Sequence, residues 1–241
     1  MIDLTNTFYN GYKRIDFYLS GHISTIIFPE VSTGKKPWIW RAEFLGDFEK
    51  ADMELVKNGW HLAYYKISDM YGCPDAIELM KNFHDYIVKE FNLYKKASIF
   101  GFSRGGLYAV NYAVKYPDNV SSLYLDAPVI DLQSWPKSKS SAKNWNDCLT
   151  CYGFNEDEAE IYSLTQMDRA RILAENKIPV LIVVGDSDPT VPYEENAKPF
   201  IQEYLKTHND IEVIVKEGCA HHPHSLDEAS PIVDFVLKHI L

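Results

Sequence analysis

The sequence contains few cysteines, four in 241 residues. A small secreted fold held together by disulfides needs a denser set, so the sequence does not imply that class. Cys148 and Cys151 form a C-x-x-C pair, but no second pair completes a four-ligand zinc site. We therefore expect structural or incidental roles for these cysteines.

Positive charge is also scarce. Twenty-four Lys and Arg stand against 34 Asp and Glu, which gives a formal net charge of −10. No run of Lys or Arg is longer than two residues. An acidic chain without a basic cluster is repelled by nucleic acid and by anionic membranes, so we expect neither as a partner.

Long hydrophobic runs are missing. No stretch approaches the ~18 apolar residues that a membrane helix requires. The first 14 residues also lack the positive patch and apolar stretch of a secretory signal. We expect a cytoplasmic protein. With 46% hydrophobic and 24% charged residues and no internal repeat, the composition is that of a globular protein, and we expect one domain over residues 1–241.

What is present is an alternation of strand-like and helix-like segments. Strands are predicted over 14–19, 24–29, 37–44, 61–68, 96–102, 121–129, 179–186 and 210–216. Helices are predicted over 48–58, 74–91, 104–115, 194–208 and 231–241. This alternation predicts an α/β fold with a mostly parallel central sheet of about eight strands flanked by helices. The first two strands flank Ser20-Gly21 and are expected to pair antiparallel.

The segment from about 131 to 171 interrupts this alternation. It is polar, carries Trp135 and Trp145, and is long for a connection between two core strands. Long insertions beside ligand sites often act as lids. An ordinary surface excursion explains the segment equally well, so both interpretations stay open.

The most informative motif is GFSRGG at residues 101–106, which places G-x-S-x-G between an apolar strand and a helix start. That is the context of a nucleophile elbow, in which a sharp turn exposes the serine hydroxyl above the sheet. Gly101 and Gly105 leave room for the neighbouring elements. The backbone N–H of Arg104, at the helix start, is a candidate donor to an oxyanion. We therefore predict Ser103 as a nucleophile.

A serine nucleophile needs an adjacent base. The best candidates lie in GCAHHPHSL, after the last predicted strand, where loops gather at the sheet edge that also carries Ser103. His221 comes first after two small residues and is preferred, with His222 and His224 as rivals. Three close histidines also suggest a metal site, although no ligand of fixed spacing stands out elsewhere. The remaining histidines are interpreted as structural or solvated: His22, His61, His84, His208 and His239.

The acid that orients the base is expected at another strand end. Asp188 lies in GDSDPTVP, just past the apolar strand that precedes it, and is preferred. Asp186 lies nearer the strand and fits a role in bracing the turn. Asp126, at the end of a different strand, is a third candidate. The order Ser103, Asp188, His221 is that of the α/β-hydrolase triad.

From about residue 14 to residue 241 the sequence resembles the α/β-hydrolase superfamily of serine esterases, lipases and peptidases. The elbow, the acid loop and the histidine loop occur in the order of that superfamily's three catalytic segments. The resemblance implies that Ser103 is the nucleophile, Asp188 the acid and His221 the base. It also implies a small cap at about 131–171 and a mechanism without cofactor or metal.

One departure from the superfamily pattern concerns the second oxyanion donor. Many members carry His-Gly after the third strand, whereas this chain has WIWRAEFLG at residues 38–46. We expect a backbone N–H between Arg41 and Leu45 to serve, with Glu43 or Phe44 nearest. The side chain of Arg41 or Glu43 either grips a polar substrate or belongs to a surface ion pair.

The predicted activity is hydrolysis of a carboxylic ester of small to medium size through an acyl-enzyme. The expected partner is a small-molecule ester, with a carbohydrate or another polar alcohol as one option. Trp38, Trp40, Trp135 and Trp145 either stack on such a group or pack the core and cap. The alternatives are a peptidase or thioesterase on the same residues, a non-catalytic binding module, and a lyase or cofactor-free peroxidase on the same scaffold.

Overall fold

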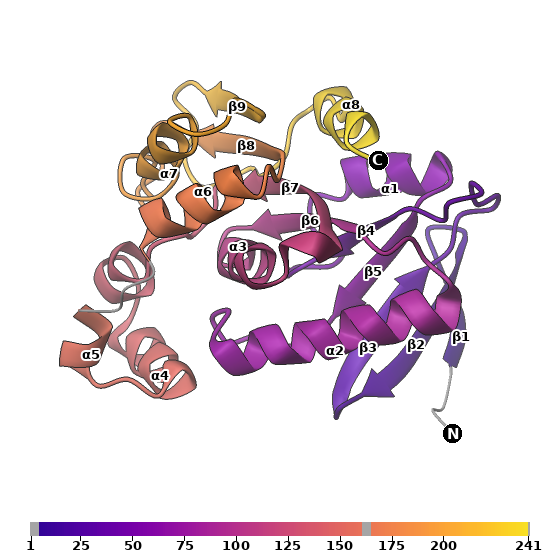
Figure 1. The fold of residues 1–241 in the computed structure, drawn as a ribbon, viewed down its shortest axis with the longest axis horizontal. Helices are drawn as coiled ribbons and strands as arrows, with labels where there is room; N and C mark the ends of the chain where they lie inside the picture. Colours follow the sequence, from indigo (N-terminus) through magenta and orange to yellow (C-terminus); the bar gives the residue numbers. More distant parts are fainter. Residues whose placement is uncertain (1–4, 161–164, 241) are drawn as a thin grey trace.

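A nine-stranded sheet forms the centre of the molecule in the computed structural model, which describes residues 5–160 and 165–240 (Figure 1). The strand order is β1-β2-β3-β5-β4-β6-β7-β8-β9. The strands are β1 (Thr5–Tyr9), β2 (Tyr12–Leu19), β3 (His22–Ile27), β4 (Trp38–Arg41), β5 (His61–Tyr65), β6 (Ala97–Phe102), β7 (Val120–Asp126), β8 (Val180–Gly185) and β9 (Ile211–Lys216). The first four in the sheet pair antiparallel, and the pairs from β5 onward are parallel.

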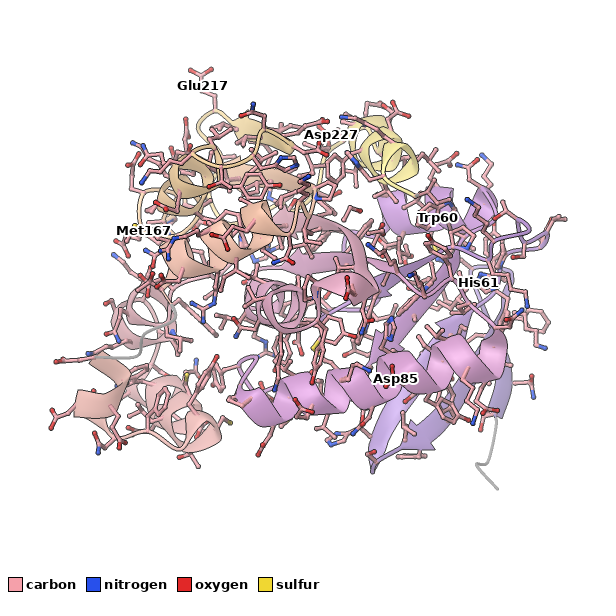
Figure 2. The ribbon with its side chains drawn as sticks, viewed as in Figure 1. Trp60, His61, Asp85, Met167, Glu217 and Asp227 are labelled. Carbon is pink, nitrogen blue, oxygen red and sulfur yellow. The ribbon has the colours of Figure 1, made fainter. Side chains whose placement is uncertain are left out.

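Helices cover both faces of the sheet. They are α1 (Lys50–Lys57), α2 (Pro74–Phe91), α3 (Gly105–Lys115), α4 (Ala142–Tyr152), α5 (Glu156–Glu160), α6 (Gln166–Glu175), α7 (Ala197–Tyr204) and α8 (Ser230–Lys238), with short helical turns η1 (Pro117–Asn119) and η2 (Gln133–Ser138). One buried cluster unites α2, α3, α6 and α7, and a second unites α1 and α8. Side chains fill the space between these layers and the sheet (Figure 2).

Helix α2 shows how the sequence pattern produces the packing. Pro74 starts the helix, where its missing N–H is harmless, and Asn92 ends it in a left-handed conformation. Its apolar residues recur every three or four positions, so they form one stripe that is buried against the sheet. The members of the stripe that are buried include Ala76, Met80, Phe83 and Ile87. The described helices include none that is long and apolar enough to cross a membrane.

The predicted fold class, an α/β fold with a mostly parallel sheet flanked by helices, is confirmed. The expected strand number was one too low, because Thr5–Tyr9 forms an additional edge strand. Four of its five residues are exposed, so it has no alternating apolar pattern to detect. The strand expected over 37–44 also ends early, at Arg41.

Trp38 and Trp40 are buried in the core, 0% and 1% exposed. Trp40 packs against Phe83 and Tyr112, with ring centroids 5.2 and 5.1 Å apart. These two tryptophans therefore pack the core, and the alternative role of stacking on a substrate is wrong for them.

Arg41 forms a buried ion pair. Its Nε lies 3.0 Å from Oδ1 of Asp52, both side chains are at most 1% exposed, and its guanidinium lies over the ring of Phe102. The surface ion pair considered for Arg41 is therefore a buried one. Because the guanidinium is enclosed by Asp52 and Phe102, it has no access to a substrate.

The insertion expected over 131–171 contains η2, α4 and α5 and runs into the first part of α6; residues 161–164 lie outside the described part. Figure 1 shows α4 and α5 beyond one end of α2, at the margin of the molecule. In contrast, α6 packs against α3 and α7. The hydroxyl of Tyr152 in α4 donates to the carbonyl of Tyr71 at 3.0 Å, which ties this segment to the loop before α2. Its role as a lid stays a prediction.

Candidate active site

Ser103 lies in the tight turn between β6 and α3. Its φ of 48° is in the left-handed region, which non-glycine residues seldom adopt. Its N–H donates to the carbonyl of Asp126 at 2.9 Å, and its carbonyl accepts from the N–H of Val129 at 2.9 Å. A Cβ at Gly101 would lie 2.9 Å from the Cβ of Ala109. The neighbouring strand and helix thus hold the turn in the conformation expected of a nucleophile elbow.

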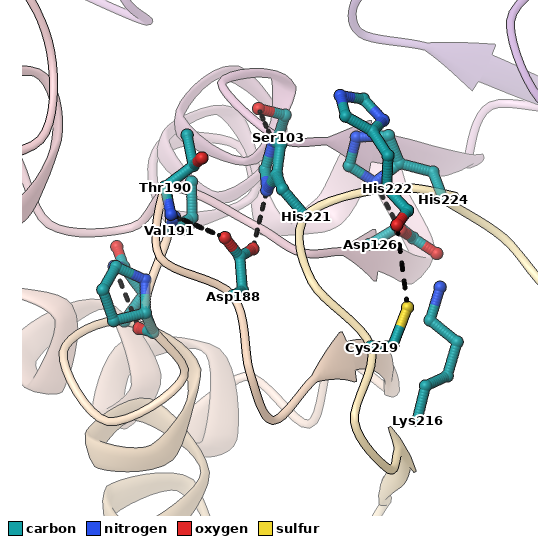
Figure 3. Close-up of polar contacts among 12 residues, drawn as sticks. Ser103, Asp126, Asp188, Thr190, Val191, Lys216, Cys219, His221, His222 and His224 are labelled. Carbon is teal, nitrogen blue, oxygen red and sulfur yellow. Dashed lines mark hydrogen bonds and ion pairs between the residues drawn. The ribbon is translucent and has the colours of Figure 1, made fainter.

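The structure brings Ser103, His221 and Asp188 into one hydrogen-bonded chain (Figure 3). Ser103 Oγ lies 3.0 Å from Nε2 of His221, and Nδ1 of His221 lies 2.6 Å from Oδ2 of Asp188. The other carboxylate oxygen of Asp188 accepts from the N–H groups of Thr190 and Val191, at 2.8 and 2.9 Å. These are the three residues that the sequence predicts for the triad.

The contacts of Asp188 determine its charge. Burial raises the pKa of Asp188. The hydrogen bonds from His221 and from two backbone N–H groups lower it by a larger amount, so the pKa of Asp188 lies below its ordinary value. The carboxylate is therefore ionised at neutral pH. An ionised Asp188 accepts the Nδ1–H of His221, which leaves Nε2 available to accept the proton of Ser103.

Gly185, at the end of β8, lets the acid loop and the histidine loop meet. A Cβ there would lie only 2.2 Å from the carbonyl oxygen of Cys219 and 2.6 Å from that of Ala220. Glycine is thus required for the chain before His221 to pass against the strand that leads to Asp188. Asp186 accepts from the N–H of Gly218 at 2.7 Å, which is the turn-bracing role expected for it.

The two remaining candidates of the sequence, Asp126 and His224, pair with each other. Nδ1 of His224 lies 2.7 Å from Oδ1 of Asp126, and both side chains are buried. From the sequence, Asp126 is an alternative to Asp188 and His224 an alternative to His221, and nothing in the sequence predicts that the two form a pair. Their positions, in loops that follow β7 and β9 at one sheet edge, were the available indication.

His221, His222 and His224 form a group whose ligand atoms all lie within 4.8 Å of one another, so these residues could hold a metal ion. His222 is exposed and stacks on Phe48. Nε2 of His221 already contacts Ser103, and Nδ1 of both His221 and His224 contacts a carboxylate. A metal ion here would compete with Ser103 for His221. The expected absence of a metal stays a prediction.

Arg104 and Glu43 face each other beside the elbow. Nε of Arg104 donates to Oε2 of Glu43 at 3.1 Å, and Nη1 donates to Asp69 at 2.6 Å. Burial raises the pKa of Glu43, although the charge of Arg104 opposes this. Glu43 is 1% exposed. The surface ion pair considered for Glu43 is therefore a buried contact at the site.

Glycine at position 105 allows the backbone of Glu43 to lie close to the start of α3. A Cβ at Gly105 would lie 3.2 Å from the Cβ of Glu43 and 3.6 Å from its backbone nitrogen. The next residue, Phe44, has a φ of 58° and lies with its ring under the guanidinium of Arg104. Both residues expected near a second oxyanion donor are thus adjacent to the elbow.

A cavity of about 190 Å³ opens beside Ser103. Its lining combines aromatic rings and polar side chains: Phe44, Asp47, Phe48, Phe102, Ser103, His221, His222 and His224. A larger and more open hollow of about 370 Å³ shares Phe44 with it and is lined by polar residues that include Tyr64, Ser68 and Arg104. The sequence did not indicate Asp47, Phe48 or Phe102 as lining residues. Asp47 and Phe48 lie in a loop without a periodic pattern, and Phe102 is a buried residue at the end of β6.

Comparison with known families gives one match. The family model described as the prolyl oligopeptidase family matches residues 59–241, a stretch that includes the elbow, the acid loop and the histidine loop. The curated proteins contain no match to the sequence.

Solved structures show the same fold. The esterase Pf2001 of Pyrococcus furiosus has a TM-score of 0.65 at 14% identity, with 100% of this chain and 93% of that chain covered. A puromycin-hydrolyzing peptidase of Mycobacterium tuberculosis has a TM-score of 0.67 at 14% identity, with 91% and 37% covered. A Bacteroides ovatus chain has a TM-score of 0.64 at 12% identity, with 100% and 35% covered. The chain thus spans little more than a third of two of these proteins and nearly all of the first.

Proposed function

This chain belongs to the prolyl oligopeptidase family, and on that basis we propose that it hydrolyses carboxylic esters through Ser103, His221 and Asp188. Its type, a serine hydrolase of the α/β-hydrolase fold, follows from the family and the fold. The observation that carries the proposal is the unbroken hydrogen-bonded chain from Ser103 Oγ through His221 to Asp188.

The mechanism begins with attack of Ser103 Oγ on the ester carbonyl while Nε2 of His221 takes the hydroxyl proton. Asp188 holds the imidazole in the required tautomer and stabilises the imidazolium that forms. The tetrahedral intermediate then collapses, the C–O bond to the alcohol breaks, and His221 gives the proton to the leaving alcohol. Water hydrolyses the acyl-enzyme by the same sequence of proton transfers and releases the acid.

Stabilisation of the oxyanion falls to backbone donors in this proposal. The N–H of Arg104, at the start of α3, is the first donor, since the helix N-terminus favours negative charge there. The N–H of Phe44 is the second, because Phe44 lines the cavity together with Ser103. The ion pair between Glu43 and Arg104 then fixes the distance between the two donor segments.

The compact cavity supports a small acyl or alcohol group. At about 190 Å³ it is only slightly larger than a cavity of ~150 Å³ that accommodates benzene. The adjoining polar hollow supports a polar alcohol, a carbohydrate among them, for the remainder of the ester. With Trp38 and Trp40 buried, this suggestion rests on the polar lining and not on tryptophan stacking.

Peptide hydrolysis is the second candidate, favoured by the match to a family of peptidases. Hydrolysis of p-nitrophenyl butyrate and of butyryl p-nitroanilide distinguishes an esterase from a peptidase, because these substrates share the acyl group and differ in the bond that is cleaved. We expect kcat/KM for the ester to exceed that for the anilide by about 1000-fold, equivalent to about 4 kcal/mol in the transition state. Glycyl-prolyl p-nitroanilide extends the test to a peptide-like substrate. Anilide turnover within tenfold of ester turnover would assign the chain to the peptidases.

A further inference from the structure

His224 lines the cavity beside Ser103 and belongs to a second Asp–His pair, with Asp126, that the hydrolytic mechanism does not use. We propose that Nε2 of His224 accepts a hydrogen bond from a hydroxyl group of the substrate, so that the preferred esters carry a hydroxyl close to the scissile bond. This inference rests on the proposed esterase function and adds a class of substrate to it. His224 is in this account a specificity-determining residue, distinct from the general base His221.

The contacts of Asp126 fix the role of each ring nitrogen of His224. Oδ2 of Asp126 accepts from the hydroxyl of Tyr124 at 2.7 Å and from the N–H of Ser225 at 2.8 Å. Burial, and then the charge of Asp126, raises the pKa of Tyr124 well above its ordinary value, so the phenol keeps its proton and donates. A carboxylate that accepts from Tyr124 and Ser225 accepts from His224 as well, so in the imidazole form of His224 the ring proton lies on Nδ1. Nε2 is then the ring nitrogen with a free lone pair.

The position of His224 brings its ring to the wall of the substrate cavity. His224 lines the cavity together with Ser103, yet its side chain is only 6% exposed. The ring contacts His221 edge to face at 4.8 Å and Phe48 edge to face at 5.3 Å. Buried Asp126 and these rings hold the imidazole in one orientation. A preorganised acceptor in a small, mostly aromatic cavity is the arrangement that discriminates a hydroxyl from a methyl group.

The discrimination has a physical cause. A substrate with an apolar group in this cavity would cover Nε2 of His224 and leave a buried acceptor without a donor. A hydroxyl of the same size would satisfy it. Sites that hydrogen-bond a substrate hydroxyl reject the analogue that lacks it far more strongly than apolar pockets reject a change of size. Of the other polar lining side chains, Ser103 and His221 are hydrogen-bonded to each other, and Asp47 and His222 are exposed.

Two matched pairs of esters test the proposal. p-Nitrophenyl 3-hydroxybutyrate and p-nitrophenyl 3-methylbutyrate differ by a hydroxyl or a methyl group in the acyl part. 2-Hydroxypropyl acetate and isobutyl acetate carry the same difference in the alcohol part, with turnover followed by pH-stat. We expect the hydroxyl ester of at least one pair to have a kcat/KM about tenfold or more above its methyl partner. The pair that shows the preference also tells which part of the ester enters the cavity.

Two substitutions separate specificity from loop positioning. His224→Asn can keep the hydrogen bond to Asp126 but has no atom at the place of Nε2, whereas His224→Gln can place an amide oxygen near Nε2. We expect His224→Asn to bring the hydroxyl-to-methyl ratio of kcat/KM close to one. We expect His224→Gln to retain part of the preference. If His224 had a purely structural role, the substitution would lower kcat/KM for both esters of a pair by the same factor and leave their ratio unchanged.

The proposal is overturned if the native protein shows no preference in either pair, or if His224→Asn leaves the ratio unchanged. Binding to the Ser103→Ala variant, measured by calorimetry with 2-hydroxypropyl acetate and isobutyl acetate, gives the same comparison without turnover. Tighter binding of the hydroxyl ester that disappears in Ser103→Ala/His224→Asn supports the role of His224 even if the proposed esterase function fails. If the native protein hydrolyses none of these esters, equal binding of the two acetates overturns the proposal.

Discussion

Replacing Ser103 with alanine is expected to lower kcat for p-nitrophenyl butyrate by at least about 1000-fold, and loss of a serine nucleophile has cost ~10⁶-fold in a well-studied hydrolase. Without the hydroxyl no acyl-enzyme forms, and only oxyanion stabilisation and binding remain. The fold should persist, because the hydrogen bonds that hold the elbow to Asp126 and Val129 are made by the backbone of Ser103. Steady-state kinetics measure the loss of kcat, and thermal unfolding of the same preparation shows whether the fold persists.

The control for this substitution is Ser187→Ala. Ser187 is exposed in the acid loop, and its hydroxyl contacts Asp186 rather than His221. We expect its kcat to stay within about threefold of the native value, as for most exposed positions outside the reacting group. Equal loss in both variants, or turnover retained by Ser103→Ala, would remove Ser103 from the mechanism.

Asp188→Asn is expected to lower kcat by about 10⁴-fold while leaving KM for the ester nearly unchanged. An amide at this position can donate to Nδ1 of His221, which favours the tautomer with the proton on Nε2. That tautomer cannot accept the proton of Ser103. The loss therefore comes from proton placement and not from a change in the shape of the site, so binding should persist.

Asp186→Asn is the matched control, two residues away in the same loop. Asp186 contacts the N–H of Gly218, and its side chain does not contact His221. We expect a loss of stability of about 1 kcal/mol at most, typical of one weakened hydrogen bond, with kcat largely retained. If Asp186→Asn and Asp188→Asn lower kcat alike, loop disruption and not the triad explains both results.

The sequence predicted the elements whose pattern is set by burial. All six residues of β8 are buried, so the strand appears as a continuous apolar run. The apolar stripe of α2 similarly reflects contact with the sheet. The residues at the site could be placed at one sheet edge because Ser103, Asp188 and His221 each follow a strand of a parallel sheet. Edge strand β1 was missed because most of its residues face solvent.

The parts that could not be predicted depend on contacts between distant residues. Asp126 and His224 are 98 residues apart, and neither lies in a periodic pattern that would indicate its partner. The ion pair of Arg41 and Asp52 could not be predicted either, because both side chains become buried only when β4 packs against α1. The positive φ of Phe44 is likewise set by the packing of its loop against α3. Such features follow from the assembled fold and not from local propensity.

The most direct test of the central claim is intact-mass spectrometry after treatment with a fluorophosphonate, followed by peptide mapping. A base-activated serine attacks the phosphorus and displaces fluoride, which leaves a stable covalent adduct. We expect one adduct, located on Ser103, that is absent in Ser103→Ala and forms much more slowly in His221→Ala. A folded native protein that acquires no adduct, or an adduct at another residue with Ser103 unmodified, would contradict it.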